Sequence, residues 1–231
     1  MRAGFGATLR HGARVIAGVG LVAGPTLAGA QVLTFEGITT GVASVPIGNY
    51  YNGSGGPNYG ITFSDNATTL CLNTATRSCS NTSRGGRGDP ASQGYAMFFQ
   101  QGANAYMNRA AGFTNGFSFF YSDVAGTGGF NVYSGLNGTG TLLASLILPQ
   151  TAIGPEPCYS AQFCPFIAAG VSFTGMAESV VFTGTNALVL DDVTFGSATA
   201  GMATTAPEPG TWALVAGGLA GLGVVARRRR S

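Results

Sequence analysis

Short apolar runs separated by glycine-rich turns set the fold class of this chain. Phe117, Phe119 and Tyr121 alternate with their neighbours in the two-residue period of a β-strand. Further strands are predicted near both ends of the body and around a glycine-rich hairpin turn, over residues 32–35, 61–63, 130–133, 142–148, 171–173, 179–183 and 188–195. Gly175 and Gly184 are predicted to lie in turns between strands.

These strands predict one all-β domain over residues 31–198, a two-sheet β-sandwich or jelly roll. No stretch of this body has a convincing helical period, and its segments do not recur at a fixed spacing, which excludes a repeat architecture. Two regions are predicted to be irregular. Residues 48–60 are rich in glycine, asparagine and tyrosine, and residues 71–94 are mostly polar.

Residues 1–30 are typical of a cleavable signal peptide. Arg2, Arg10 and Arg14 form a positively charged start, and an apolar run follows over residues 15–23. Ala28 and Ala30 then present small side chains to signal peptidase. The apolar run is too short to span a membrane. We therefore expect cleavage after Ala30, so that the mature chain begins at Gln31.

Four cysteines agree with export, because an even number in a secreted chain suggests disulfides. Cys71 and Cys79 are eight residues apart, and Cys158 and Cys164 are six apart. Of the three possible connectivities we predict the local pairs, each contributing about 2–3 kcal/mol on the chain-entropy model. A zinc site is the alternative, although neither pair has Cys-x-x-Cys spacing and no histidine lies nearby.

The carboxyl-terminal end has the features of a membrane stop-transfer segment. A small polar linker over residues 199–206 leads to Pro207, Glu208 and Pro209 and then to an apolar run over residues 212–226. Four arginines follow this run and favour the cytoplasmic side of a membrane: Arg227, Arg228, Arg229 and Arg230. The apolar run spans only about 22 Å against about 30 Å of hydrocarbon. A transmembrane helix over about residues 211–226 would therefore be a marginal anchor.

The order and spacing of these three parts resemble the PEP-CTERM sorting signal of bacterial exported proteins, over residues 207–230. The resemblance implies that the tail is held in the inner membrane and processed by an exosortase, a membrane-embedded cysteine transpeptidase. Pro207, Glu208 and Pro209 would be the recognition tripeptide and not catalytic residues. The protein would then reach the cell surface or the extracellular matrix. A plain single-span membrane protein is the alternative.

Two shorter segments, residues 33–37 and 190–195, resemble the first and last strands of carbohydrate-binding-module jelly rolls. In that fold these strands lie side by side, and their carboxylates often hold a structural calcium. The resemblance implies that Glu36 with Asp191 or Asp192 forms half of a calcium site, since calcium prefers oxygen ligands. Two solvated acidic strand ends are the alternative.

Charge and residue content exclude several function classes. Between Gln31 and Ala206 the chain has four arginines and eight carboxylates, so this body has a net charge of −4. A negative net charge argues against nucleic-acid binding. The only histidine, His11, lies in the predicted signal peptide, and the chain has no lysine. The mature chain therefore cannot form a Ser-His-Asp triad, a histidine-ligated metal centre or a Schiff base. A carboxylate-pair glycosidase stays open because it needs only two acids.

Tyr50 and Tyr51, in the irregular stretch over residues 48–60, are candidates for stacking on sugar rings, with core packing as the alternative. Together these features predict a non-catalytic exported protein of the cell surface or extracellular matrix, with no cofactor beyond the calcium considered above. A glycan-binding module of the extracellular polysaccharide is the second hypothesis. A carboxylate-pair glycoside hydrolase is a distant third.

Overall fold

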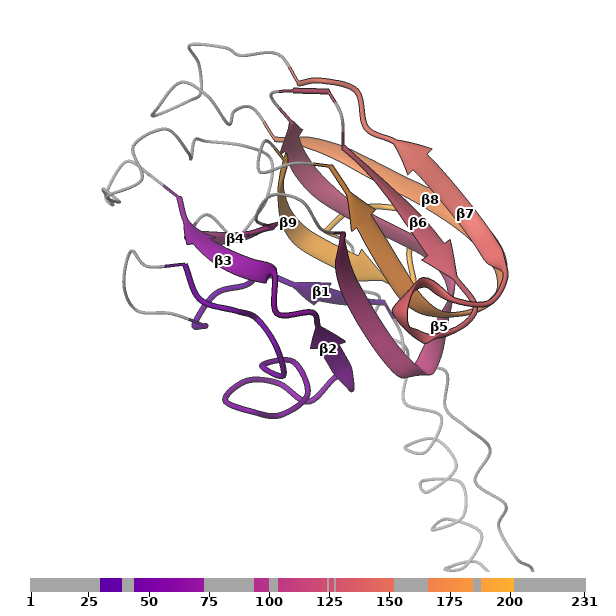
Figure 1. Cartoon of the computed structure of the whole chain (residues 1–231), viewed down its shortest axis with the longest axis horizontal. Coiled ribbons are helices and arrows are strands. Elements are labelled where there is room, and N and C mark those ends of the chain that lie inside the picture. The colour runs from indigo at the N-terminus through magenta and orange to yellow at the C-terminus, as the bar shows by residue number, and fades with distance from the viewer. Residues whose placement is uncertain are drawn as a thin grey trace, which may run out of the picture.

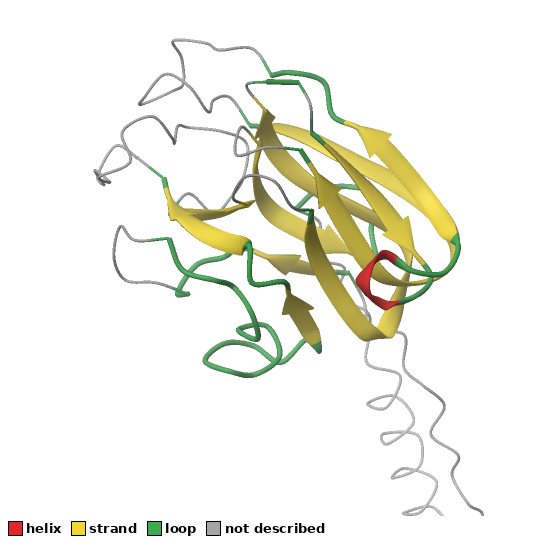
Figure 2. Ribbon diagram, viewed as in Figure 1, coloured by secondary structure: helices red, strands yellow, loops and turns green. Residues whose placement is uncertain are grey.

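The computed structural model describes residues 30–38, 44–72, 94–99, 104–123, 125–126, 128–151, 166–184 and 188–201. Within these residues the chain is built from strands and a single 3-10 turn (Figure 2). The elements are β1 (Gln31–Leu33), β2 (Ile61–Phe63), β3 (Ala67–Cys71), β4 (Tyr95–Phe99), β5 (Ala105–Asp123), β6 (Gly129–Tyr133), η1 (Leu136–Gly138), β7 (Leu142–Ile147), β8 (Ile167–Thr183) and β9 (Leu188–Phe195). No helix of the described part is long and apolar enough to cross a membrane.

Hydrogen bonds join all nine strands into one sheet, in the order β3-β4-β9-β5-β8-β6-β7, with β1 added to β9 and β2 added to β5 (Figure 1). Every pairing in it is antiparallel: β1–β9, β2–β5, β3–β4, β4–β9, β5–β8, β5–β9, β6–β7 and β6–β8. The sequence predicts two sheets, whereas the structure has one continuous sheet. The reason is that two long strands, β5 and β8, belong to both halves of the molecule.

The two halves meet where β5 and β8 change partners. The early part of β5 pairs with β2 and with the late part of β8, which also pairs with β6. The late part of β5 pairs with the early part of β8 and with β9. We call these the β6 half (β2, β6, β7 and the adjoining parts of β5 and β8) and the β9 half (β1, β3, β4, β9 and the other parts).

Irregular backbone marks the change from one half to the other. The β5–β8 register shifts between Asn108 and Phe113 and again between Phe113 and Asn115. Gly112 and Asn115 have positive φ angles of 69° and 76°, and Gly175 in β8 has a φ of 93°. Bulges of this kind bend a strand and increase its twist. The prediction that Gly175 lies in a turn between two strands is therefore wrong, because Gly175 lies inside one long strand.

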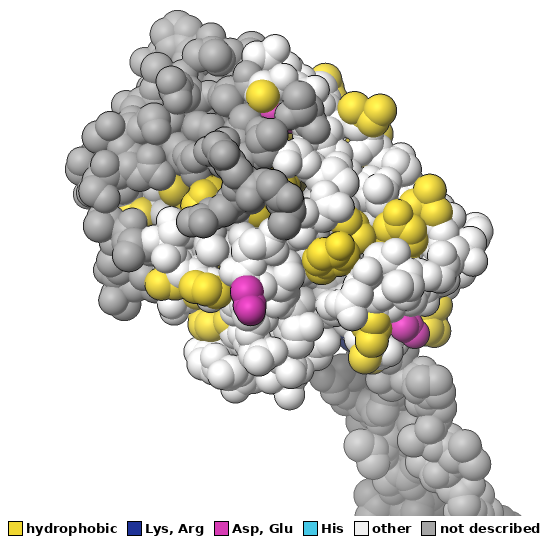
Figure 3. All heavy atoms as spheres, in the orientation of Figure 1, with side chains coloured by type: hydrophobic (Ala, Val, Ile, Leu, Met, Phe, Trp, Pro, Cys, Tyr) yellow, Lys and Arg dark blue, Asp and Glu magenta, His cyan; other side chains and the backbone are white. Residues whose placement is uncertain are grey.

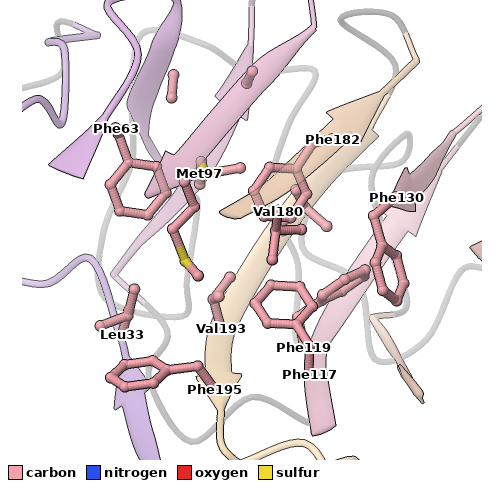
Figure 4. Close-up of a cluster of buried hydrophobic side chains, with 14 of the residues drawn as sticks. Leu33, Phe63, Met97, Phe117, Phe119, Phe130, Val180, Phe182, Val193 and Phe195 are labelled. Atoms are coloured by element: carbon pink, nitrogen blue, oxygen red, sulfur yellow. The ribbon is translucent and has the colours of Figure 1, made fainter. Parts of the chain in front are cut away.

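Aromatic rings fill the space between the two halves (Figure 4). Phe119 of the β9 half contacts Phe130 and Phe182 of the β6 half, with ring centroids 5.1 and 6.2 Å apart. Phe117 contacts the same two rings at 5.4 and 5.9 Å. All four side chains are fully buried. The folded sheet thus packs on itself as a β-sandwich, and the alternation around Phe117 and Phe119 marks the inward face.

A second apolar cluster lies on the other face of the β9 half. Its members come from β3, β4, β5 and β9 and from the residues directly after β3 and before β8: Leu70, Leu72, Ala96, Phe98, Phe120, Phe166 and Val189. Met97 and Phe99, which alternate with Ala96 and Phe98, belong to the central core. Strands buried on both faces lose the alternation of apolar and polar residues. This explains why β3 and β4 lie outside the strands that the sequence predicts.

The ends of the domain lie next to each other. Gln31 pairs directly with Phe195, and a Cβ atom on Gly196 would lie 3.1 Å from the Cα atom of Ala30. Beyond β9 the chain is held against β5, where Ser118 Oγ donates a 2.9 Å hydrogen bond to the carbonyl oxygen of Ser197. The first strand begins at Gln31, where we predict the mature chain to begin. The remainder of the predicted signal peptide, including Ala28, lies outside the described residues.

Candidate functional site

The residues predicted to form a site near the first and last strands lie in one region of the β9 half. Strands β1 and β9 pair side by side, with Leu33 opposite Val193, as the resemblance implies. Glu36 follows β1 in a turn, while Asp191 and Asp192 lie within β9. Strand β4 pairs with the same edge of β9 further along, with Met97 opposite Leu190. β1 and β4 therefore pair with consecutive parts of the same edge of β9, and the turn after β1 lies between these two parts.

The carboxylate of Glu36 holds the start of β4. Its Oε1 atom accepts hydrogen bonds from the backbone N–H groups of Gly94 and Tyr95, at 2.7 and 2.9 Å. The backbone carbonyl of Glu36 accepts a 3.3 Å hydrogen bond from the Tyr50 hydroxyl. Glu36 thus ties three segments of the chain together, a structural role that its place in the sequence does not reveal.

Tyr51 lies in the core and not on the surface. Its side chain is 3% exposed and contacts the rings of Phe35, Tyr50 and Tyr59 at centroid distances of 5.0 to 6.1 Å. Its hydroxyl oxygen accepts a 2.7 Å hydrogen bond from the backbone N–H of Phe35. Burial raises the pKa of the Tyr51 phenol, and the charge of Asp191 adds to the effect. A ring in this position has no free face for a sugar, so the predicted stacking role of Tyr51 is not supported by its placement.

Tyr50 is half-buried at the edge of the same aromatic group. Its ring packs against the backbone of Gly56 so closely that a Cβ atom there would overlap it. The surrounding loop carries the exposed residues Asn52 and Asn58. The Oδ1 atom of Asn58 accepts a 3.2 Å hydrogen bond from the backbone N–H of Gly60. Of the two predicted ligand residues, Tyr50 is the one that lies near the surface, in the same loop as these exposed amides.

Asp191 and Asp192 lie at a bulge in β9. The β5–β9 register shifts between Ser118 and Phe120, and Asp192 has a positive φ of 46°. The Asp191 Oδ1 atom accepts a 2.7 Å hydrogen bond from the backbone N–H of Asp192, and both side chains are buried. They are therefore not solvated strand ends, which was the alternative to a calcium site.

No group of three His, Cys, Asp or Glu side chains in the described part could hold a metal ion. Glu36 directs Oε1 to two backbone N–H groups, as described above. The structure therefore offers a structural role for Glu36 without metal, and calcium binding at Glu36 with Asp191 or Asp192 stays a prediction.

Several described acids bond to the backbone, which bears on the hydrolase hypothesis. Such an enzyme needs two carboxyl groups that face one cleft. Glu36 and Asp191 accept the backbone hydrogen bonds given above, and Asp123 accepts three more from the turn after β5. These three carboxylates organise turns and a bulge through their backbone hydrogen bonds.

Arg109 is a residue whose role the sequence does not predict. Half-buried at the bend of β5, it donates through Nε to the carbonyl oxygen of Tyr59 at 3.2 Å and through its guanidinium to Gly112. Its guanidinium carbon lies 5.2 Å from the centre of the Phe195 ring. Burial lowers the pKa of this guanidinium. Arg109 is one of only four arginines between Gln31 and Ala206, and this scarcity of cations is the only sequence signal for its role.

The predicted cysteine pairs are only partly within the described residues. Cys71, at the end of β3 and opposite Tyr95, is buried and disulfide-bonded. Cys79, Cys158 and Cys164 lie outside the described residues, so the predicted pairs remain predictions. The same is true of Pro207, Glu208, Pro209 and the four arginines of the tail.

The structure thus defines an all-β sandwich domain. Residues 205–230 match the PEP-CTERM protein-sorting motif, two residues further towards the amino terminus than the sequence predicts. The chain therefore carries a motif of exported proteins that are anchored in the membrane before an exosortase processes them.

Two solved structures show weak likeness to the chain. The K2 cleaved adhesin domain of Lys-gingipain is 13% identical with a TM-score of 0.41, covering 72% of this chain and 98% of that one. The carbohydrate-binding module CBM6cm-2 from Cellvibrio mixtus lichenase 5A, in complex with cellotriose, is 9% identical with a TM-score of 0.35, covering 68% and 96%. Both TM-scores are too low to assign a fold or a ligand. No curated protein sequence matches the chain.

Proposed function

We propose that this protein is a non-catalytic component of the cell surface or extracellular matrix, delivered there by its sorting motif. The observation that carries the proposal is the match of residues 205–230 to the PEP-CTERM motif. Only residues 202–204 separate this motif from Gly201, the last described residue of the domain. At about 3.4 Å per extended residue, so short a connection keeps the domain close to the site of processing.

The composition of the mature chain supports a role without catalysis. Its lack of histidine and lysine removes the common nucleophile–base pairs. Three of the buried or half-buried acids bond to backbone N–H groups, which accounts for their position without any reaction. The domain has a large aromatic core and is suited to a stable structural or binding role.

The test is to follow processing of the full-length precursor in a host that has the matching exosortase. Wild-type protein should appear at the surface or in the matrix, shortened at its carboxyl terminus. Glu208→Ala should insert in the membrane but accumulate there as precursor. Thr204→Ala, just outside the motif, is the matched control and should be processed normally. Normal release of Glu208→Ala would reduce the tail to an ordinary transmembrane anchor.

A second candidate function is glycan binding by the loop around Tyr50. The observation that favours it is the half-buried Tyr50 ring beside the exposed amides of Asn52 and Asn58. Aromatic rings can stack on sugar rings, and asparagine amides can hydrogen-bond sugar hydroxyls. The exported protein should then be retarded in gels that contain the host's polysaccharide, and Asn52→Ala should weaken the retardation. Asn131→Ala, on the β6 half, is the control; equal retardation of all three proteins would remove this candidate.

A further inference from the structure

Strand β7 is an edge of the sheet within the described residues. It is the last strand in the hydrogen-bonded order and pairs with β6 alone among the described strands (Figure 1). An edge strand presents a row of backbone N–H and C=O groups that can pair with another extended chain. Natural proteins usually block such edges with charged residues, proline or bulges that turn the edge away.

The hairpin that carries this edge has no charge. Residues 124–155, which include β6, η1 and β7, contain no Asp, Glu, Arg, Lys or His, and the first proline after β6 is Pro149. The only irregularity in the β6–β7 pairing is between Val132 and Tyr133, at the hairpin end. Along most of β7 the edge therefore lacks the features that normally prevent pairing.

The same hairpin carries most of the exposed aliphatic surface. Five large hydrophobic side chains are exposed in the described residues, and three of them belong to this hairpin: Leu136, Leu142 and Ile147, at 38%, 51% and 80%. Figure 3 shows hydrophobic side chains gathered over β6 and β7. Leu142 and Ile147 flank β7 at its two ends, opposite Tyr133 and Gly129. Exposed aliphatic groups beside an open edge indicate a binding surface.

We propose that β7 pairs antiparallel with β7 of a second copy of this chain, forming a two-fold symmetric dimer. Antiparallel pairing lays the Leu142 end of one strand beside the Ile147 end of the other, so the exposed aliphatic groups of both copies meet. An isologous contact requires a surface that is compatible with itself. An uncharged strand meets this condition, since no like charges are brought together, whereas a charged ligand gains nothing from it. This proposal does not rest on the proposed function, because it concerns the domain alone.

The test is sedimentation equilibrium of the exported protein, as purified from its host. Wild-type protein should show a reversible monomer–dimer equilibrium. Ile147→Lys should raise the dissociation constant about tenfold or more, because it brings charges together at the edge and removes an apolar contact. Met176→Lys is the matched control: Met176 is 50% exposed on β8, its side chain lies against Gly112 of β5, and the dissociation constant should not change. Melting temperatures close to that of wild type show that the variants are folded.

Photo-crosslinking locates the contact independently of any loss of affinity. A benzoylphenylalanine at Ser145, an exposed position in the middle of β7, should yield a dimer whose crosslink maps to residues 142–147 of the other copy. The same group at Thr174 of β8 should not. A monomer at every concentration overturns the proposal, as does an equal effect of Met176→Lys. Crosslinks to the tail, or a monomer that loses polysaccharide binding on Ile147→Lys, would assign the surface to another occupant and also overturn it.

Discussion

Asp123, the last residue of β5, accepts a 2.8 Å hydrogen bond through its Oδ2 atom from the backbone N–H of Gly128. Its Oδ1 atom accepts two more, each 2.9 Å long, from Ala125 and Gly126. The side chain is fully buried. A single carboxylate therefore holds the turn that leads from β5 to β6, and the three donors offset the cost of burying it.

We predict that Asp123→Ala lowers the free energy of unfolding by about 2–4 kcal/mol, because three backbone N–H groups, of which that of Gly128 is buried, lose their acceptor. Urea denaturation followed by circular dichroism measures this loss. Asp65→Ala is the control, since Asp65 is exposed in a turn and should change stability by no more than about 0.5 kcal/mol. Equal effects of the two substitutions would mean that the hydrogen bonds of Asp123 do not contribute to the free energy of unfolding.

Tyr51 predicts a specific alkaline loss of stability. Burial raises the pKa of its phenol in the folded state, so the folded protein keeps this proton while the unfolded chain loses it near pH 10. Above about pH 10 the unfolded chain therefore holds fewer protons, and the free energy of unfolding falls as the pH rises. Tyr51→Phe should remove this part of the pH dependence.

At neutral pH Tyr51→Phe should instead cost about 1–3 kcal/mol, because the backbone N–H of Phe35 loses its acceptor. The variant should thus be less stable than wild type at neutral pH but lose less stability than wild type as the pH rises above about 10. A general loss of packing would lower stability equally at both pH values. Urea unfolding at pH 8 and at pH 11 measures both. The same pH dependence in wild type and variant would show that the phenol is not buried as described.

Glu36 permits a test that separates a metal role from a structural one. Because Glu36 accepts hydrogen bonds from Gly94 and Tyr95, Glu36→Ala should lower the melting temperature even in chelator. If calcium also binds at Glu36 with Asp191 or Asp192, excess calcium should raise the melting temperature of wild type and not that of Glu36→Ala. A wild-type melting temperature that does not respond to calcium would leave Glu36 with its structural role alone.

The disulfides predict a simple mapping result. Peptides of the exported protein, prepared without reductant, should link Cys71 to Cys79 and Cys158 to Cys164. Reduction should lower the melting temperature, since each small loop contributes about 2–3 kcal/mol on the chain-entropy model. A link between Cys71 and either Cys158 or Cys164 would instead show that a long-range bridge joins β3 to the segment before β8.

Several features of this protein follow from the sequence alone. The sorting motif is a contiguous segment recognised as such, so Pro207, Glu208 and Pro209 and the arginines after them are visible without a fold. Most strands are also visible, because one-sided burial produces the alternation seen around Phe117 and Phe119. The absence of histidine and lysine limits the chemistry of the mature chain whatever its shape.

Other features depend on residues that are distant in the chain. Tyr51 and Tyr50 are neighbours of the same type, and only packing against Phe35 and Tyr59 makes Tyr51 a core residue while Tyr50 stays at the edge. The continuity of β8 through Gly175 depends on pairing with β5 and β6, because a glycine of positive φ is equally compatible with a turn. The sequence alone thus determined the sorting motif and most of the segments that form strands. Long-range pairing decided which strands are edges, which tyrosine is buried and which carboxylates hold the backbone, since these depend on partners that local patterns do not identify.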